Sequence, residues 1–258
     1  MSTVSSITRT GQNEPFNLQV SREQISFHED FYKFGYGSCS QTLVTIWDND
    51  GGLYQYPSGG TTTLTVSSSD NSDRFGGSAA QSVTVQGLDE NYLEVSETIN
   101  LEGQSAVATS NTFTRVNRAF VAEAGVDGDA AGDIYIGEGT VSSGVPANVY
   151  SKITQGNNQT LQTVYTVPAN KVLYLDDVVF SAAVSTGNKT VTMKFVTREF
   201  GSNVFRVRYQ IPLQSGFAED RFYYPLKIPP KTDIQVRAIG DSDNNFVAGT
   251  YQGILIQE

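Results

Sequence analysis

The residues that could carry out chemistry in this sequence are few. It contains one histidine, His28, and one cysteine, Cys39. A Ser-His-acid triad would need this histidine, and a Cys-His pair could use only these two residues. Neither residue lies in the sequence context of a nucleophile elbow or a cysteine protease, and a zinc site needs three or four His or Cys ligands. The sequence therefore predicts a protein that is not an enzyme and binds no cofactor.

Carboxylate pairs are the other source of chemistry, because a glycosidase needs only two of them. The adjacent pairs are Asp176-Asp177 and Glu219-Asp220. Neighbours along a strand point to opposite faces, so neither pair is arranged to act on one bond. We interpret both pairs as solvated strand edges and keep a depolymerase as a third alternative.

Two acidic loops have the composition of calcium ligands. Asp48 and Asp50 lie in the loop DNDGG, and Asp127, Asp129 and Asp133 lie in VDGDAAGD. The first loop lacks the distal bidentate glutamate of a twelve-residue calcium loop. We interpret both loops as turns and leave Ca²⁺ binding open as the alternative.

The composition limits the partners that the chain can have. Its formal net charge is −10 and its pI is about 4.6. A nucleic-acid partner needs a basic face and is not expected. A membrane partner is not expected either, because the sequence has no run of about 20 apolar residues and its first residues do not resemble a secretory signal. A single cysteine permits no internal disulfide, so we expect synthesis in a reducing cytosol.

The clearest structural pattern lies in residues 83–103 (VTVQGLDENYLEVSETINLEG). Two apolar-alternating runs flank the polar residues 89–91, with Val83 and Val85 on one face of the first run. A side-chain period of two predicts a β-hairpin with one apolar face. A two-stranded ribbon cannot bury that face alone, so a second layer must cover it. Glu97 interrupts the apolar face, which is explained by a strand edge, a β-bulge or a subunit contact, and the bulge is the ordinary expectation.

The rest of the sequence continues this strand-like pattern. Charged residues make up only 17% of the chain, and β-branched residues and turn formers are abundant, as is typical of all-β proteins. The segment with the most helical character is Arg22–Phe31 (REQISFHEDF), which Ser21 could cap. We therefore predict an all-β protein with one short helix near its N-terminus.

The chain divides into three regions. We predict an irregular N-terminal arm at residues 1–40, a β-rich domain at 41–146 and a C-terminal jelly-roll-like domain at 147–258, with a boundary near Pro146. Strands in the last region recur roughly every 10 to 15 residues, which suits an antiparallel sandwich or jelly roll. The predicted fold is thus two antiparallel β-sandwich or jelly-roll-like domains behind an irregular arm.

Three groups of side chains are candidates for binding surfaces. Aromatic residues of the arm can pack on their own domain or on a neighbouring subunit; they are Phe27, Phe31, Tyr32, Phe34 and Tyr36. A basic stripe can form salt bridges within its domain or contact another subunit; it comprises Arg198, Arg206 and Arg208, with Arg221. Tyrosine rings can stack on sugars, and the candidates are Tyr54, Tyr56, Tyr223 and Tyr224.

Much of the sequence from about Trp47 onward resembles virion structural proteins of marine tailed phages. The segments that carry this resemblance are QSVTVQGLDENYLEVSETINLEG, SNTFTRVNRAF, GDIYIGEGTVSSGVPANVYSKI, QTLQTVYTVPANKVLYL, VTREFGSNVFRVRYQ and FYYPLKIPPKTDIQVRA. The resemblance implies a location in the virion and transfers no catalytic residue.

From this resemblance and the absence of an evident active site we expect a capsid decoration or cement protein. Its expected partners are the major capsid protein and further copies of itself, as a homotrimer, after synthesis in the cytoplasm of a host bacterium. Such proteins stabilise a shell by adding interface area. The alternative is a tail or fibre module that binds a host receptor or glycan.

Overall fold

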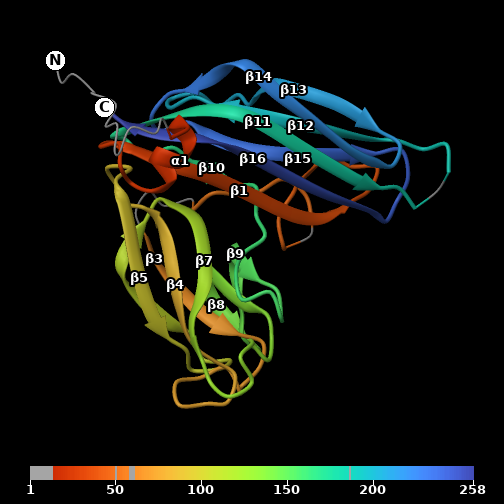
Figure 1. Ribbon diagram of the computed structural model, residues 1–258. Helices are drawn as coiled ribbons and strands as arrows, with labels where there is room; N and C mark the ends of the chain where they lie inside the picture. Colours follow the sequence, from red (N-terminus) through yellow and green to blue (C-terminus); the bar gives the residue numbers. More distant parts are fainter. Residues whose placement is uncertain (1–13, 50, 58–61, 186) are drawn as a thin grey trace.

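The computed structural model describes residues 14–49, 51–57, 62–185 and 187–258. The all-β prediction is confirmed, because 59% of the described residues are in strands and 3% are helical. The strands form four antiparallel sheets (Figure 1). Within the described residues, no helix has the length and apolar character that a membrane span requires.

Two of the sheets face each other across one hydrophobic core, which contains Phe180, Phe195 and Tyr251. The first sheet has the order β1 (His28–Cys39), β16 (Asn245–Gln257), β11 (Lys171–Ala183) and β14 (Gly216–Ile228). The second has the order β10 (Tyr165–Thr166), β15 (Asp233–Gly240), β12 (Val191–Arg198) and β13 (Arg206–Leu213), with β2 (Val44–Thr45) also paired to β15. We call this unit the terminal sandwich, because it contains the first and the last strand.

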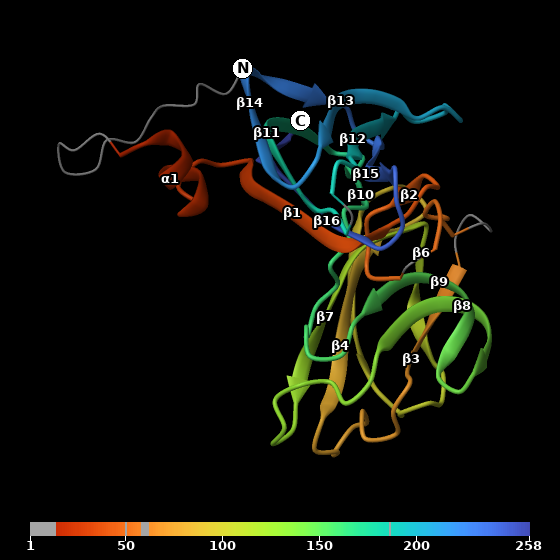
Figure 2. The same cartoon turned by 90° about the vertical axis from the view of Figure 1, so that its right-hand side faces the viewer.

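The other two sheets form a second sandwich around a separate core, which contains Leu64, Phe113 and Ile136. One sheet has the order β6 (Val107–Phe113), β3 (Thr62–Ser68), β8 (Ile134–Ser142) and β9 (Val145–Ile153). The other has the order β5 (Glu94–Asn100), β4 (Ala80–Leu88) and β7 (Arg115–Ala124). Figures 1 and 2 show this unit, the inserted sandwich, projecting from one side of the terminal sandwich.

The inserted sandwich interrupts a strand of the terminal sandwich. β2 pairs with the second half of β15 and β10 pairs with its first residues, so both short strands lie along the same neighbour. Between them, the Ile46 N–H donates to the Val236 carbonyl and the Thr163 N–H donates to the Ile46 carbonyl, at 2.9 and 3.0 Å. The chain therefore leaves the sheet after Ile46 and returns to the same point at Thr163.

The N-terminal region differs from the predicted arm. Residues 1–13 lie outside the described residues, but β1 pairs with β16 over its full length without a register shift. The helix α1 spans Phe16–Ser21, whereas the predicted helix at Arg22–Phe31 is wrong. Position 35 of this strand requires glycine, because a Cβ atom there would lie only 2.6 Å from the Thr163 backbone nitrogen and would clash with it. The aromatic and glycine residues that looked irregular thus belong to a strand that crosses the insertion point.

The strand pairing also groups the chain differently from the division at residues 40 and 146. β1 and β2 complete the sheets of the C-terminal strands. Pro146 lies inside β9 and pairs with Val141 of β8. Proline has no N–H to donate, and Pro146 is tolerated because it lies near the turn that joins β8 to β9. It therefore marks a turn within a domain and not a boundary between domains.

The predicted hairpin is confirmed. β4 and β5 pair with Val83 opposite Ile99, and the Asp89 carboxylate closes the turn by accepting hydrogen bonds from the N–H groups of Asn91 and Leu93. The predicted bulge at Glu97 is wrong, because the β4–β5 register is continuous. Glu97 instead accepts hydrogen bonds from the backbone N–H groups of residues 110 and 111 in β6, which joins the two sheets of the inserted sandwich.

Candidate functional site

The most elaborate polar arrangement lies where the two sandwiches meet. Cationic side chains alternate there with aromatic rings in one continuous series, which we call the cation–aromatic ladder. Its members in order are Arg237, Phe205, Arg198, Tyr56, Arg115, Tyr92, Lys231 and Phe200. Each cation lies 4.1 to 5.4 Å from the centroid of the neighbouring ring, within the range of a cation–π interaction.

The ladder crosses between the two sandwiches. Tyr56, Tyr92 and Arg115 belong to the inserted sandwich and its entry segment, and the other members come from β12, β15 and their adjoining loops. Two guanidinium groups converge on Asp233, the first residue of β15, which is 3% exposed. A cation–π contact is worth about 0.5 to 2 kcal/mol, so the series contributes to holding the sandwiches together.

Among the described residues, Asp233 is the only carboxylate that forms ion pairs with Arg115 and Arg198. Arg115 donates to both its oxygens, at 2.8 and 3.3 Å, and Arg198 donates twice to Oδ2, at 3.0 and 2.5 Å. The Thr166 hydroxyl donates to Oδ1 at 2.6 Å. A buried carboxylate with this many charge-assisted hydrogen bonds is fully satisfied.

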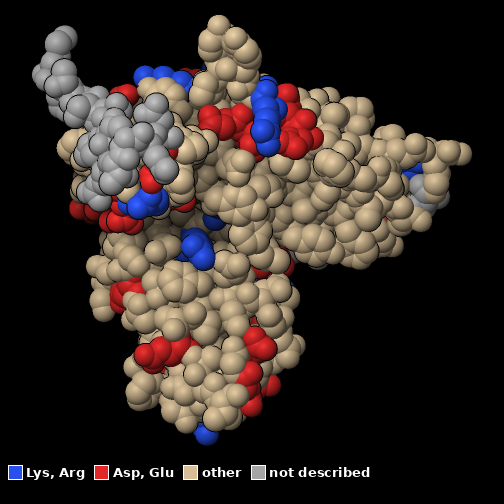
Figure 3. Space-filling view, viewed as in Figure 1, with Lys and Arg blue, Asp and Glu red and all other residues tan. Residues whose placement is uncertain are grey.

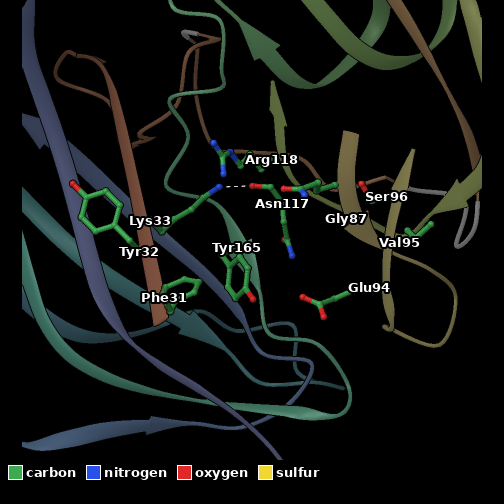
Figure 4. A pocket seen from close by; sticks show the side chains of 11 residues that line it. Phe31, Tyr32, Lys33, Gly87, Glu94, Val95, Ser96, Asn117, Arg118 and Tyr165 are labelled. Carbon is green, nitrogen blue, oxygen red and sulfur yellow. Dashed lines mark hydrogen bonds between the residues drawn. The ribbon is translucent and has the colours of Figure 1, made fainter. Parts of the chain in front are cut away.

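A second feature of the junction is a buried lysine in a cleft of about 330 Å³ (Figure 4). Lys33 of β1 is 8% exposed, and its ammonium donates to the backbone carbonyl of Asn117 in β7. Burial first, and then the charge of Arg118, lower the pKa of Lys33 from 10.5 to about 7, against an opposing effect of Asp48. Lys33 could have been found from the sequence, because it shares the inward face of its strand with Phe31 and Gly35.

A third contact between the sandwiches also involves a lysine. The Lys171 ammonium of β11 donates to Glu29 at 2.8 Å and to Glu94 at 2.6 Å. Glu29 lies in β1 and Glu94 opens β5 of the inserted sandwich. Lys171 is 5% exposed, and a buried charge requires such partners.

The arm aromatics predicted as contacts divide between two sides of β1. Phe31 is buried in the core of the terminal sandwich, against Tyr165 and Tyr251. Tyr32 and Tyr36 are exposed on the other face, and Phe34 is half-buried there. Phe27 is also exposed, just before the strand. A strand sends alternate side chains to opposite faces, so the exposed members remain candidates for contacts with another subunit.

The predicted basic stripe does not stay together. Arg198 lies in the ladder, whereas Arg206 and Arg208 are exposed on β13, an edge strand. Arg206 forms an exposed ion pair of 3.6 Å with Glu199, and such pairs contribute little to stability. Arg221 pairs with Glu219 of its own strand.

The four candidate tyrosines also divide. Tyr54 is 4% exposed and its hydroxyl donates to the Tyr150 carbonyl, and two guanidinium groups of the ladder lie 4.4 and 4.8 Å from the centroid of the Tyr56 ring. These two rings therefore do not form an exposed pair for stacking on a sugar. Tyr223 and Tyr224 are 90% and 80% exposed on β14.

The acidic loops have partners within the chain. Asp48 accepts a hydrogen bond from the Leu161 N–H at 2.9 Å, while Asp50 lies outside the described residues. Asp133 pairs with Lys152 at 2.8 Å and accepts from the Gln155 N–H. In the part of the chain that the structure describes, no three His, Cys, Asp or Glu side chains are grouped to hold a metal ion.

Comparison with known proteins shows no related family and only weak structural similarity. No family model matches the chain, and no curated protein matches it, so the marine tailed phage family has no support there. Solved structures that are similar to it include two of one virus. A structure of infectious bursal disease virus, Gx strain, is 12% identical, with 98% of this chain and 79% of that chain covered at a TM-score of 0.25. A subviral particle of VP2 from the same virus is 11% identical, with 90% and 73% covered at a TM-score of 0.24. Scores this low carry no argument about function.

Proposed function

We propose that this chain is a structural protein of a virion, in the role of a capsid decoration or cement protein. The observation that carries the proposal is the strand order of the terminal sandwich. Counting β2 and β10 as one interrupted strand, its eight strands alternate between the two sheets except at β12 and β13, which are neighbours in one sheet, and the first and last strands are adjacent, as in a jelly roll. Jelly rolls are typical of viral capsid and lectin domains, and also of cupins.

An assembly role is further supported by β14, the outer strand of the first sheet. It pairs with β11 on one side, and along most of its 13 residues the side chains are exposed or half-buried. Phe217, Tyr223 and Tyr224 are 74%, 90% and 80% exposed. A long edge strand with exposed aromatic residues is prone to pair with or pack against another chain. We assign this edge to contacts with further copies, as a homotrimer, or with a major capsid protein.

The position of the inserted sandwich fits the same role. It projects from one side of the terminal sandwich (Figures 1 and 2), so the terminal sandwich can lie on a shell while the other points away. Uncharged side chains cover most of the face shown in Figure 3. Interfaces are depleted in charged residues at their centre, so this surface suits packing between subunits.

Electron microscopy of intact virions, labelled with gold-tagged antibody to this chain, tests the proposal. Label over the whole head supports a decoration protein. Label confined to the tail or to one vertex contradicts it, as does the absence of the chain from purified virions. A variant with Tyr223→Ser and Tyr224→Ser should lose head binding, whereas Arg74→Gln, at an exposed position of the inserted sandwich, should retain it.

The second candidate function is a host-receptor or glycan-binding module of a tail or fibre. The observation in its favour is the same exposed tyrosine pair, whose rings lie 4.8 Å apart, nearly perpendicular to each other. Exposed aromatic rings offer apolar faces to sugars. Adsorption of the purified chain to host cells, lost in the double tyrosine variant while virion heads stay unlabelled, would favour this function.

A further inference from the structure

The cation–aromatic ladder carries more positive charge than the junction neutralises. The guanidinium groups of residues 115, 198 and 237 lie along one series, and Asp233 pairs with only the first two. Its oxygens already accept five hydrogen bonds, one of them from Thr166. No acceptor capacity remains there for Arg237, since a carboxylate offers about four lone-pair sites.

Arg237 is held in place without a carboxylate. Its Nε donates to the Gln235 side-chain oxygen at 2.9 Å, and its guanidinium lies 4.1 Å from the centroid of the Phe205 ring. Gln235 is itself fixed by hydrogen bonds with Thr45 and Tyr56. Across the described residues, Arg237 has no ion-pair partner among the salt bridges of the chain. Its two terminal nitrogens are therefore oriented but not neutralised.

The surroundings accentuate this imbalance. Burial, and also the positive charge of Arg198, lower the pKa of Arg237, although it stays protonated at neutral pH. A half-buried cation without a counterion is costly unless a partner compensates it. The protein as a whole is acidic, with a formal net charge of −10, so a local excess of cations is not a consequence of composition.

A hollow adjoins these side chains and gives a ligand access to them. It has a volume of about 450 Å³. The residues that line it include Gln55, Tyr56, Arg115, Arg198, Phe205 and Arg237. This volume suits a ligand the size of one sugar residue. The Tyr56 and Phe205 rings each already have two guanidinium groups within 4.8 Å of their centroids, so we assign recognition to the guanidinium groups.

We propose that this hollow is a binding site for a small ligand bearing an oxyanion, either a carboxylate or a phosphate. Arg237 is the main ligand residue, and Arg198 and Arg115 supply supporting charge. The planar fork of a guanidinium matches two oxygens of either group. The site reaches both sandwiches, through Arg115 on one side and Arg237 on the other, so a bound anion would also join them.

Isothermal titration calorimetry of the purified chain tests this site with three matched sugars. Glucuronate carries a carboxylate, glucose 6-phosphate carries a phosphate, and glucose is neutral. We expect one or both anions to bind while glucose does not. Binding of glucuronate alone assigns a carboxylate ligand, and binding of glucose 6-phosphate alone assigns a phosphate ester.

Two variants and a control locate the binding. Arg237→Gln should weaken the binding by at least about tenfold, because a charge-assisted hydrogen bond is lost, while Arg237→Lys should retain part of it. Arg208→Gln, on an exposed edge, should bind like the natural chain. Circular dichroism checks that each variant is folded.

Two results would overturn the proposal. Neither anion binds any better than glucose, or both bind equally well to Arg237→Gln and to the natural chain. In either case the ladder serves only to join the sandwiches. These measurements use the isolated chain, so their outcome is independent of where the protein lies in a virion.

Discussion

Replacing Lys33 by methionine should stabilise the protein at neutral pH. Methionine has a similar length and no charge, so it removes the cost of burying an ammonium group. The Asn117 carbonyl, which accepts from Lys33, also accepts from the Gln162 side chain at 3.1 Å. The Asn117 carbonyl therefore keeps a hydrogen-bond partner in the variant. The usual penalty of such a substitution, a buried acceptor without a partner, does not arise.

The magnitude follows from the pKa of Lys33, which is about 7 in the folded chain against 10.5 for an ordinary lysine. Between these values the unfolded chain binds more protons, so stability rises with pH. The penalty is fully present below pH 7, where it amounts to roughly 5 kcal/mol at 1.36 kcal/mol per pH unit. It should fall by about 2 kcal/mol between pH 7 and pH 9.

Urea unfolding at a series of pH values measures this effect. Trp47 is the single tryptophan and is 6% exposed near the junction, so its fluorescence reports the loss of packing there. The natural chain should gain stability from pH 7 to pH 9 relative to Lys33→Met. Lys227→Met, at an exposed lysine, is the control and should follow the natural chain. A Lys33→Met variant that is less stable at pH 7, or whose stability runs parallel to the natural chain over this range, would refute the reasoning.

Three further outcomes are expected. Burial raises the pKa of Asp48 from 3.8 to about 6, so the stability of the natural chain should fall as the pH rises from 3.8 to 6. In urea unfolding, Asp48→Asn should abolish that fall and raise the free energy of unfolding by up to about 3 kcal/mol at pH 7. Asp233→Asn leaves Arg115 without its ionised partner and should cost about 3 to 5 kcal/mol in the same assay, and a loss below 1 kcal/mol would contradict the ion-pair network described above. Tyr223→Ser with Tyr224→Ser should lower the oligomer mass seen by light scattering without changing the unfolding midpoint, and an unchanged mass would exclude these residues from the subunit contact.

Local patterns in the sequence predicted where many of the strands lie. The β4–β5 hairpin is specified by its alternation and by the turn at Asp89, all within 21 residues of sequence. The alternation of the last region likewise predicted β11 to β16 as strands, although among them only β12 and β13 are consecutive strands that pair with each other.

Pairings between distant residues could not be predicted in this way. β1 pairs with β16 at the other end of the chain, and the interruption between β2 and β10 leaves no trace in local periodicity. The predicted domain boundary therefore followed the turn at Pro146 and missed the point where the chain returns to its sheet.

The candidate site was hidden for the same reason. Arg115 and Asp233 are 118 residues apart in sequence, and each on its own is an ordinary charged residue at a strand end. Arg198 was singled out for its charge, but only the fold separates it from the exposed Arg206 and Arg208. Tyr56 was selected for its ring, and only the packing shows that two cations lie against it.

The return of the chain to its point of departure has a consequence for the order of folding. The Thr163 hydroxyl donates to the Ile46 carbonyl at 2.7 Å across 117 residues. Closing a flexible loop of this length costs about 4 kcal/mol of chain entropy. Once the inserted sandwich has folded, its two ends already lie close together, so most of this entropy has been lost before β2 and β10 pair with β15. The inserted sandwich then acts as an intramolecular template: it aligns β2 with β10, and β15 meets the two short strands as one.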